Sequence, residues 1–285
     1  MLPTGLVQKR LTPGDVPAAL KLSQEPGWNQ VAEDWSLMLG PGLTHGVFTE
    51  QGRLVASALS VPYGARYAWI AMVLVTAEFR RRGIATDLMR TCVEELLGRG
   101  LVPALDATPE GRQVYLPLGF KDVYSITRLF SDEDARPGSP RHETVRPMIE
   151  DDLDAVADYD ARLCGADRSF ILTDLHRRRP EAAFLALQGK EVVGYVLARN
   201  GWRSNQIGPL LAETPAIAQN LLAGALGGLS GPVCIDIGDR HKDLRGWLED
   251  LCFKPQFPFI RMIHGRSEPF DDPNRVFIIA GPELG

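Results

Sequence analysis

The residues best suited to chemistry form a basic turn between an expected strand and an expected helix. An apolar, β-prone run at 69–75 ends abruptly, Arg80-Arg-Arg-Gly83 follows, and apolar residues then recur at helical spacing from Ile84 to Leu96. The first-turn N–H groups of a helix lack intrahelical partners and lie at its positive end, so this arrangement suits a phosphate. On this stretch alone, a solvated basic corner before an ordinary helix is an equal alternative.

The spacing within the turn separates these alternatives. Neither a GxGxxG nor a GxxxxGK[ST] pattern is present here. Arg80-x-x-Gly83-x-Ala85, directly after Val73-Leu-Val75, resembles the acyl-CoA pyrophosphate loop of the GNAT superfamily of N-acetyltransferases, whose third glycine is often alanine. Further along, Tyr115-Leu-Pro-Leu-Gly-Phe120 resembles the closing Y-x-x-x-GF signature of the same family. The two motifs occur in the family's order.

The resemblance implies how acetyl-CoA binds as co-substrate. The backbone of Val73, Leu74 and Val75, splayed from its neighbouring strand, would bond the pantetheine arm, with the Leu74 N–H at the thioester oxygen. The pyrophosphate would be held by Arg80, Arg81, Arg82, Gly83, Ile84, Ala85 and Thr86.

Two residues are the catalytic candidates. Tyr115 falls where the family places the phenol that protonates coenzyme A, and its alternative is a packed aromatic on a short helix. Asp106, at the end of an expected strand, is the first candidate for the general base. A capping or loop role for Asp106 is equally open, with ordered water as the base.

An acceptor site is expected opposite the cofactor, walled by the early helices. Its candidates are Trp28, Asn29, Asp34 and Trp69, since aromatic walls with one carboxylate suit a small cationic amine. The alternative is that the early tryptophans, Trp28 and Trp35, simply pack the helices onto the sheet.

Composition limits the number of domains and the kinds of partner that we expect. The chain has 285 residues, 45% hydrophobic and 24% charged, which fits two globular domains. A net charge of −5 argues against a nucleic-acid partner. The four cysteines show no CxxC pairing, the five histidines lack metal spacing, and no apolar run is long enough for a membrane. We therefore expect a cytoplasmic protein without a metal.

The order of expected elements in residues 1–130 is β-α-α-β-β-β-α-β-α-β, which is the order of the GNAT fold. The fold class is thus α/β (α+β), with two tandem GNAT-like domains, each a mixed, mostly antiparallel twisted sheet flanked by helices. Residues 131–144 are charged and rich in Pro, Gly and Ser, which is typical of a linker.

Residues 145–285 repeat landmarks of the first domain, which predicts a duplication. Counting back from a shared Leu position in the helix, Glu213 takes the place of Arg80 and Ala216 that of Gly83. The counterpart of Tyr115 is Leu248. We therefore expect a degenerate GNAT-like domain without its own cofactor, similar to the C-terminal partner in tandem members of the superfamily.

Two functions follow from these expectations. The first is an N-acetyltransferase that moves an acetyl group from acetyl-CoA to the amine of a small-molecule acceptor, by direct attack in a ternary complex. The second is a non-catalytic acyl-CoA-binding sensor whose second domain contacts another protein. Tyr115 and the intact thioester strand favour the enzyme.

Overall fold

The computed structural model describes residues 2–132 and 144–285 and divides into two compact units. Unit 1 comprises Met1–Lys121 and Met262–Ser267, and unit 2 comprises Asp122–Arg261 and Glu268–Gly285. Most of the expected linker, residues 133–143, lies outside the described residues. The domain limits 1–130 and 145–285 stay predictions.

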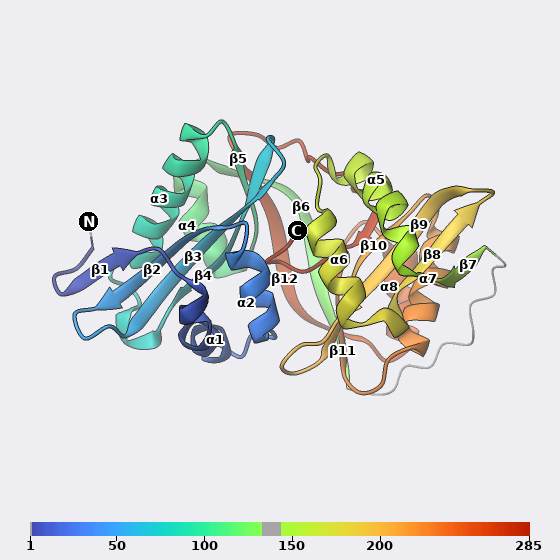
Figure 1. The fold of residues 1–285 in the computed structure, drawn as a ribbon, viewed down its shortest axis with the longest axis horizontal. Helices are drawn as coiled ribbons and strands as arrows, with labels where there is room; N and C mark the ends of the chain where they lie inside the picture. Colours follow the sequence, from blue (N-terminus) through green and yellow to red (C-terminus); the bar gives the residue numbers. More distant parts are fainter. Residues whose placement is uncertain (1, 133–143) are drawn as a thin grey trace. The chain divides into compact units, whose positions relative to one another are not determined.

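The elements of unit 1 follow the expected order (Figure 1). They are β1 (Leu6–Lys9), α1 (Val16–Gln24), α2 (Ala32–Leu39), β2 (Leu43–Thr49), β3 (Leu54–Tyr63), β4 (Tyr67–Val75), α3 (Ile84–Gly98), β5 (Val102–Ala107), α4 (Pro109–Tyr115) and the start of β6 (Phe120–Ser131). Short 3-10 turns cover Pro13–Asp15, Ala77–Phe79 and Leu116–Leu118.

The sheet of unit 1 runs β1-β2-β3-β4-β5 and continues into β12 (Lys254–His264), whose last residues belong to this unit. Neighbours are antiparallel from β1 to β4, and β4 and β5 are parallel. Helices α1 and α3 both pack on β3 and β4, and Figure 1 shows them on opposite faces. Cover on both faces explains why β3 and β4 are apolar almost throughout.

Unit 2 repeats this order. After the rest of β6 come β7 (Val145–Pro147), α5 (Leu153–Cys164), α6 (Ser169–Arg178), β8 (Phe184–Gln188), β9 (Glu191–Arg199), β10 (Asn205–Ala212), α7 (Pro215–Gly227), β11 (Val233–Gly238), α8 (Lys242–Asp250), β12 and β13 (Val276–Ile278). Short 3-10 turns cover Glu150–Asp152 and Pro180–Ala182.

The sheet order of unit 2 is β7-β8-β9-β10-β13-β11-β6, mostly antiparallel, with β10 and β11 parallel. Its core joins these strands to α7 and α8 through fully buried side chains such as Leu210, Leu221 and Leu248. Each unit is therefore a mixed, mostly antiparallel sheet with helices, as the sequence predicts.

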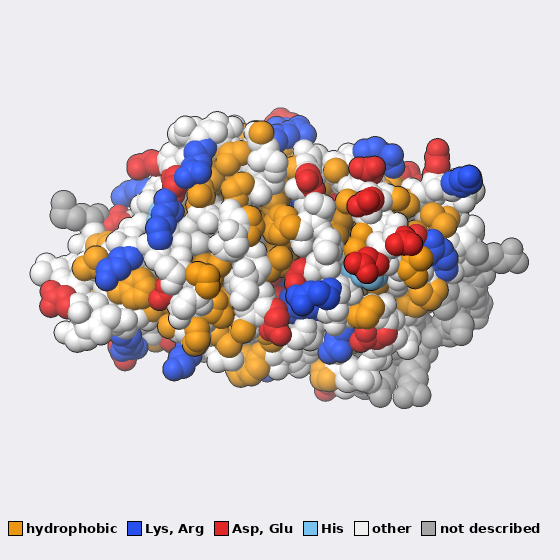
Figure 2. All heavy atoms as spheres, viewed as in Figure 1, with side chains coloured by type: hydrophobic (Ala, Val, Ile, Leu, Met, Phe, Trp, Pro, Cys, Tyr) orange, Lys and Arg blue, Asp and Glu red, His pale blue; other side chains and the backbone are white. Residues whose placement is uncertain are grey.

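The cysteines, the helix lengths and the surface charges bear on the kind of protein this is. All four cysteines are free thiols. Across the residues that the structure covers, no helix has the length and apolar character needed to cross a membrane. Figure 2 shows acidic and basic side chains interspersed over the displayed face rather than gathered by sign.

Candidate functional site

The backbone of β4 is irregular three residues before its end. Ser57 pairs with Leu74 and Leu59 with Ala71, so β4 carries one residue more than β3 between these pairs. Met72 takes the extra position with φ of 53°, an uncommon value for a non-glycine residue. The buried Ser57 hydroxyl donates to the Met72 carbonyl at 2.7 Å. This bulge redirects the end of β4.

The pairing of β4 with β5 ends three residues before the bulge, at Trp69. Their described ladder joins residues 67–69 to residues 102–104, although β4 continues to Val75 and β5 to Ala107. We call residues 70–75 and 105–107 the β4–β5 fork. On its β5 side the fork offers the β4 backbone no ladder partner among the described residues, so a ligand can use that edge.

The chain after β4 forms a loop, residues 76–83, that ends at the start of α3. Gly83 is the N-cap residue with φ of 81°, and nothing lies within 4 Å of the position that a Cβ would take. Glycine is therefore needed for backbone conformation rather than for space. The first-turn amides of α3, residues 84–86, follow it and suit an anion.

Two of the three loop arginines bind their own loop. The Arg80 Nε donates to the Val75 carbonyl at 2.9 Å, and the Arg82 guanidinium donates to the Glu78 carbonyl at 2.8 Å. Arg82 also lies over the Phe79 ring, 4.9 Å from its centroid. Arg81 is exposed, with φ of 61°. The arginines thus stabilise the loop and make it positive, and the backbone amides are the better candidates for direct phosphate contact.

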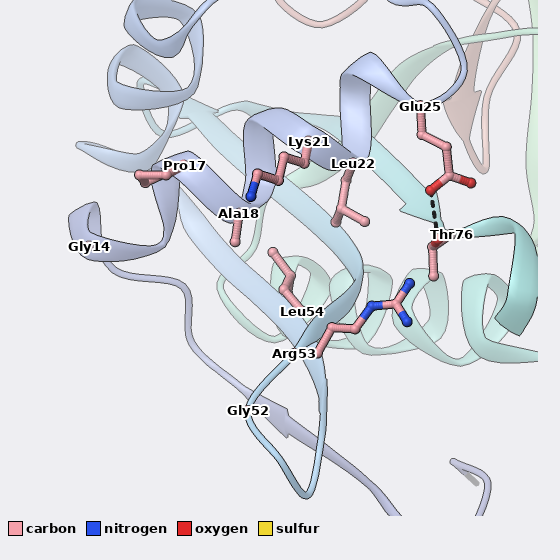
Figure 3. A pocket seen from close by; sticks show the side chains of 10 residues that line it. All are labelled: Gly14, Pro17, Ala18, Lys21, Leu22, Glu25, Gly52, Arg53, Leu54 and Thr76. Carbon is pink, nitrogen blue, oxygen red and sulfur yellow. Dashed lines mark hydrogen bonds between the residues drawn. The ribbon is translucent and has the colours of Figure 1, made fainter.

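Glu25, just after α1, fixes the start of the same loop (Figure 3). Its carboxylate accepts from the Thr76 hydroxyl at 2.6 Å and from the Ala77 N–H at 2.7 Å, and lies 3.7 Å from the Arg80 guanidinium. These hydrogen bonds, the Thr76 bond first, and the nearby arginines lower the pKa of Glu25. Glu25 is a residue that the sequence analysis missed.

A cleft of about 500 Å³ lies beside this contact. Figure 3 shows the residues that line it, which come from α1 and the turns on either side of it, from the β2–β3 turn and the start of β3, and from the start of the loop. They are Gly14, Pro17, Ala18, Lys21, Leu22, Glu25, Gly52, Arg53, Leu54 and Thr76.

Tyr115 ends α4 and is half-buried. Its ring lies 6.0 Å from that of Phe120, and a Cβ on Gly111 would come within 3.0 Å of its Cε2. Burial, and to a smaller extent the Cys92 thiol, raises the pKa of Tyr115 to about 12. The phenol therefore keeps its proton at neutral pH, as an acid requires. The packed-aromatic alternative describes its ring, and its hydroxyl stays the predicted acid.

Other candidates lie in several parts of unit 1. Asp106 is half-buried on β5, within the fork. Trp69 is buried on β4, Asn29 is buried in the α1–α2 connection, and Trp28 beside it is half-buried. Their assignment to the base and the acceptor site stays a prediction.

Two early residues have evident structural contacts. The Asp34 carboxylate accepts from the Val31 N–H at 2.8 Å, which caps α2, and it is only 1% exposed. The indole N–H of the fully buried Trp35 donates to Ser23 at 3.1 Å. Trp35 thus joins α2 to α1, which is a structural role, while the packing of both tryptophans onto the sheet stays an alternative.

Two family models match the chain in tandem. Residues 17–120 match the model described as "Acetyltransferase (GNAT) family", and residues 156–278 match "Acetyltransferase (GNAT) domain". The chain belongs to the GNAT acyltransferase family. We call units 1 and 2 its first and second GNAT domains.

Two relatives are similar to this chain over most of its length. A protein of Pseudoalteromonas sp. (strain SANK 73390) named holothin acyltransferase is 28% identical over 98% of this chain and 97% of its own length. YitH of Bacillus subtilis (strain 168), named an N-acetyltransferase, is 25% identical over 84% of each chain.

Solved structures share the fold. A Pyrococcus horikoshii protein assigned to the acetyltransferases covers 100% of this chain and 98% of its own, with a TM-score of 0.80 at 22% identity. A tandem GNAT protein from the clavulanic acid biosynthesis pathway covers 90% of this chain and 98% of its own, with a TM-score of 0.62 at 14% identity.

The second GNAT domain lacks the equivalent loop. Only Glu213 and Thr214 join β10 to α7, whose N-cap is Thr214. Ala216 lies inside α7, two residues after its N-cap, so it does not take the N-cap place that Gly83 takes in α3. The reason is that α7 begins two residues earlier than α3 when both are counted from the shared leucine. Leu248, the predicted counterpart of Tyr115, is fully buried in the core and carries no hydroxyl. In the part of the chain that the structure describes, no cluster of three His, Cys, Asp or Glu could hold a metal.

Proposed function

We propose that the first GNAT domain binds acetyl-CoA and transfers its acetyl group to the amine of a small-molecule acceptor, in a ternary complex. The observation that carries this proposal is the continuity of one segment. The bulged end of β4, which forms one side of the fork, the 76–83 loop and the α3 N-terminus follow one another along the chain. Such a segment suits a ligand with an extended amide arm at one end and a diphosphate at the other.

Binding would use mainly backbone groups. The edge formed by Val73, Leu74 and Val75 would pair with the pantetheine amides, as a neighbouring strand would. Residues 84–86 would donate first-turn N–H groups to the pyrophosphate, and Arg80, Arg81 and Arg82 would add positive charge. The pair Arg80–Glu25 would hold the loop in shape before the ligand arrives.

The transfer itself needs three functions. The acceptor nitrogen attacks the thioester carbon, so that a C–N bond forms and the negative charge develops on oxygen, where the Leu74 N–H would donate. The C–S bond then breaks, and Tyr115 would protonate the leaving sulfur. The attacking nitrogen gives up one proton, to Asp106 or to water, so one proton leaves nitrogen and one reaches sulfur.

The acceptor wall would involve Trp28, Asn29, Asp34 and Trp69. Asn29, Asp34 and Trp69 are buried, and Asp34 already caps α2, whereas Trp28 is half-buried. Trp28 is therefore the first residue to test for contact with the acceptor. An aromatic face there suits a cationic or aromatic amine.

A thiol-release screen tests the proposal. Full-length protein is incubated with acetyl-CoA or longer acyl-CoA donors and a panel of small amines, beside a Gly83→Asp variant. We expect amine-dependent thiol release by the wild type and none by the variant. Acetyl-CoA binding without turnover on any amine would instead favour the non-catalytic sensor.

A further inference from the structure

The second GNAT domain also contains a fork between its two parallel strands. Residues 205–207 of β10 pair with residues 233–235 of β11, and both strands continue beyond this ladder. We call residues 208–212 and 236–238 the β10–β11 fork. Here β13 lies between the two strands, with Leu210 opposite Ile278 on one side and Ile237 opposite Ile278 on the other.

Hydrogen bonds fix both ends of the inserted segment, residues 275–279. The Ala212 N–H donates to the Arg275 carbonyl at 3.0 Å, and the Ile279 N–H donates to the Asp236 carbonyl at 3.1 Å. Its apolar side chains are buried, with Ile278 fully so. The segment therefore satisfies strand edges that the fork would otherwise leave without a partner.

Gly208 shows that β10 is adapted to this segment. A Cβ at that position would lie 2.0 Å from the Ile279 carbonyl oxygen, and its φ of 148° also disfavours other residues. Close approach of the two backbones thus requires glycine.

Charge also favours the inserted segment. Glu213, the first residue after β10, accepts from the Arg275 guanidinium at 3.1 Å through each oxygen. The Tyr159 hydroxyl donates to the same carboxylate at 3.3 Å. An acid therefore stands where the first domain begins its phosphate loop, and its partner is supplied by the inserted segment.

His241 contacts the inserted segment and the residues just before it. The His241 ring stacks on Phe277 with centroids 4.1 Å apart. Its Nε2 lies 3.0 Å from the carbonyl oxygens of Pro273 and Val276, to which it donates.

We propose that residues 275–279 are an internal ligand of the second domain, occupying the place that a pantetheine arm would take between β10 and β11. The second domain then binds no acyl-CoA, because its fork is filled and not merely because its loop has lost positive charge. The chain carries one acyl-CoA. The inference rests on the proposed function only in placing the pantetheine arm at a fork.

Hydrogen exchange on the full-length protein tests the insertion directly, with acetyl-CoA as the probe. Without ligand, we expect the amides of Ala212 and Ile279 to be strongly protected, and unchanged when acetyl-CoA is added. The amides of residues 84–86 should gain protection on the same addition. Protection of Ala212 and Ile279 that appears only with acetyl-CoA would overturn the proposal.

Calorimetry and two variants complete the test. We expect one acetyl-CoA per chain, and Arg275→Gln should speed exchange at Ala212 by on the order of tenfold without creating a second site. Gly208→Ala should speed exchange at Ile279, again with one site retained. Two sites in either variant or in the wild type would overturn the proposal. No acetyl-CoA binding at all, with Ala212 and Ile279 still protected, would refute the proposed function and leave the internal ligand supported.

Discussion

The two forks begin alike and end differently. In each GNAT domain, a short parallel ladder joins the fourth and fifth strands and then stops while both strands continue. In the first domain, the described sheet order places no strand between β4 and β5, whereas β13 lies between β10 and β11 in the second. A fork in a sheet is thus a general receptor for an extended chain, and the occupant decides whether it serves as a ligand site.

The loop between the fourth strand and the following helix also differs between the two domains. The first domain has eight residues, 76–83, between strand and helix, with three arginines and a left-handed Gly83. The second has only Glu213 and Thr214. Eight residues can curl so that the helix amides face an anion, while two residues can only join the elements. The two domains therefore differ in loop length and in loop charge, as well as in the strand that lies at the fork.

The largest expected effect contrasts the starts of α3 and α7. Gly83→Asp forces a side chain into a left-handed position and adds an anion beside the amides, so the acetyl-CoA affinity should fall by on the order of 100-fold or more. Ala216→Asp adds the same charge to the exposed first turn of α7, should leave affinity unchanged and is the control. Isothermal calorimetry measures both. Equal affinities in the two variants would show that the loop does not bind the cofactor.

The next effect concerns Tyr115, whose predicted counterpart in the second domain, Leu248, cannot donate a proton. Tyr115→Phe should lower kcat by on the order of 100-fold with little change in acetyl-CoA affinity, since only the leaving-group proton is lost. The pKa of about 12 adds a second readout. The wild type should show no loss of kcat/KM assignable to Tyr115 until the pH approaches that value. A basic limb near pH 9 that vanishes in the phenylalanine variant would contradict this.

A smaller effect separates the two acidic residues beside the strand ends. Glu25→Ala removes two hydrogen bonds from the start of the 76–83 loop, so acetyl-CoA affinity should fall by about tenfold with saturated kcat retained. Glu213→Ala should lower only the melting temperature, since it breaks the pair with Arg275. The distinction fails if Glu25→Ala lowers stability and leaves the KM for acetyl-CoA unchanged.

The sequence alone predicts those features of the fold that depend on local residue patterns. Helical spacing and the positions of turn residues give the element order of residues 1–130, and α3 begins directly after Gly83 as expected. The sequence pattern does not predict where the end of one strand lies relative to the end of another. The inserted β13 and the inclusion of Met262–Ser267 in unit 1 join residues far apart in sequence, with no period to reveal them.

The contacts of individual side chains could not be predicted from the sequence either. Asp34 sits three residues after Val31 and caps α2, yet as a lone carboxylate near tryptophans it was equally consistent with an amine site. Two glycines offered signals that could have been used. Gly111, one turn before Tyr115, leaves room for the ring, and Gly208 lies inside an apolar strand, where glycine often marks close backbone approach.

The smallest expected effect is a pH dependence that compares one buried histidine in each domain. Burial lowers the pKa of both His45 and His241, and a nearby arginine, Arg10 or Arg240, lowers it further. A group with a depressed folded-state pKa contributes stability above its unfolded pKa, and that stability is lost as the pH falls through the folded-state value. Both histidines should therefore weaken the fold as the pH falls below about 6.5.

Melting temperatures at pH 7.5 and 5.5 measure this effect in the wild type and in His45→Gln and His241→Gln. The wild type should melt lower at pH 5.5, by about a few degrees, and each variant should lose part of that difference. Because the charged His241 ring would be buried beside the inserted segment, acid should also lower the protection of the Ile279 amide, measured against its intrinsic exchange rate at each pH, and His241→Gln should abolish that loss. His45→Gln should leave the loss of protection intact. If acid lowers Ile279 protection equally in both variants, then the charge on His241 does not loosen the inserted strand.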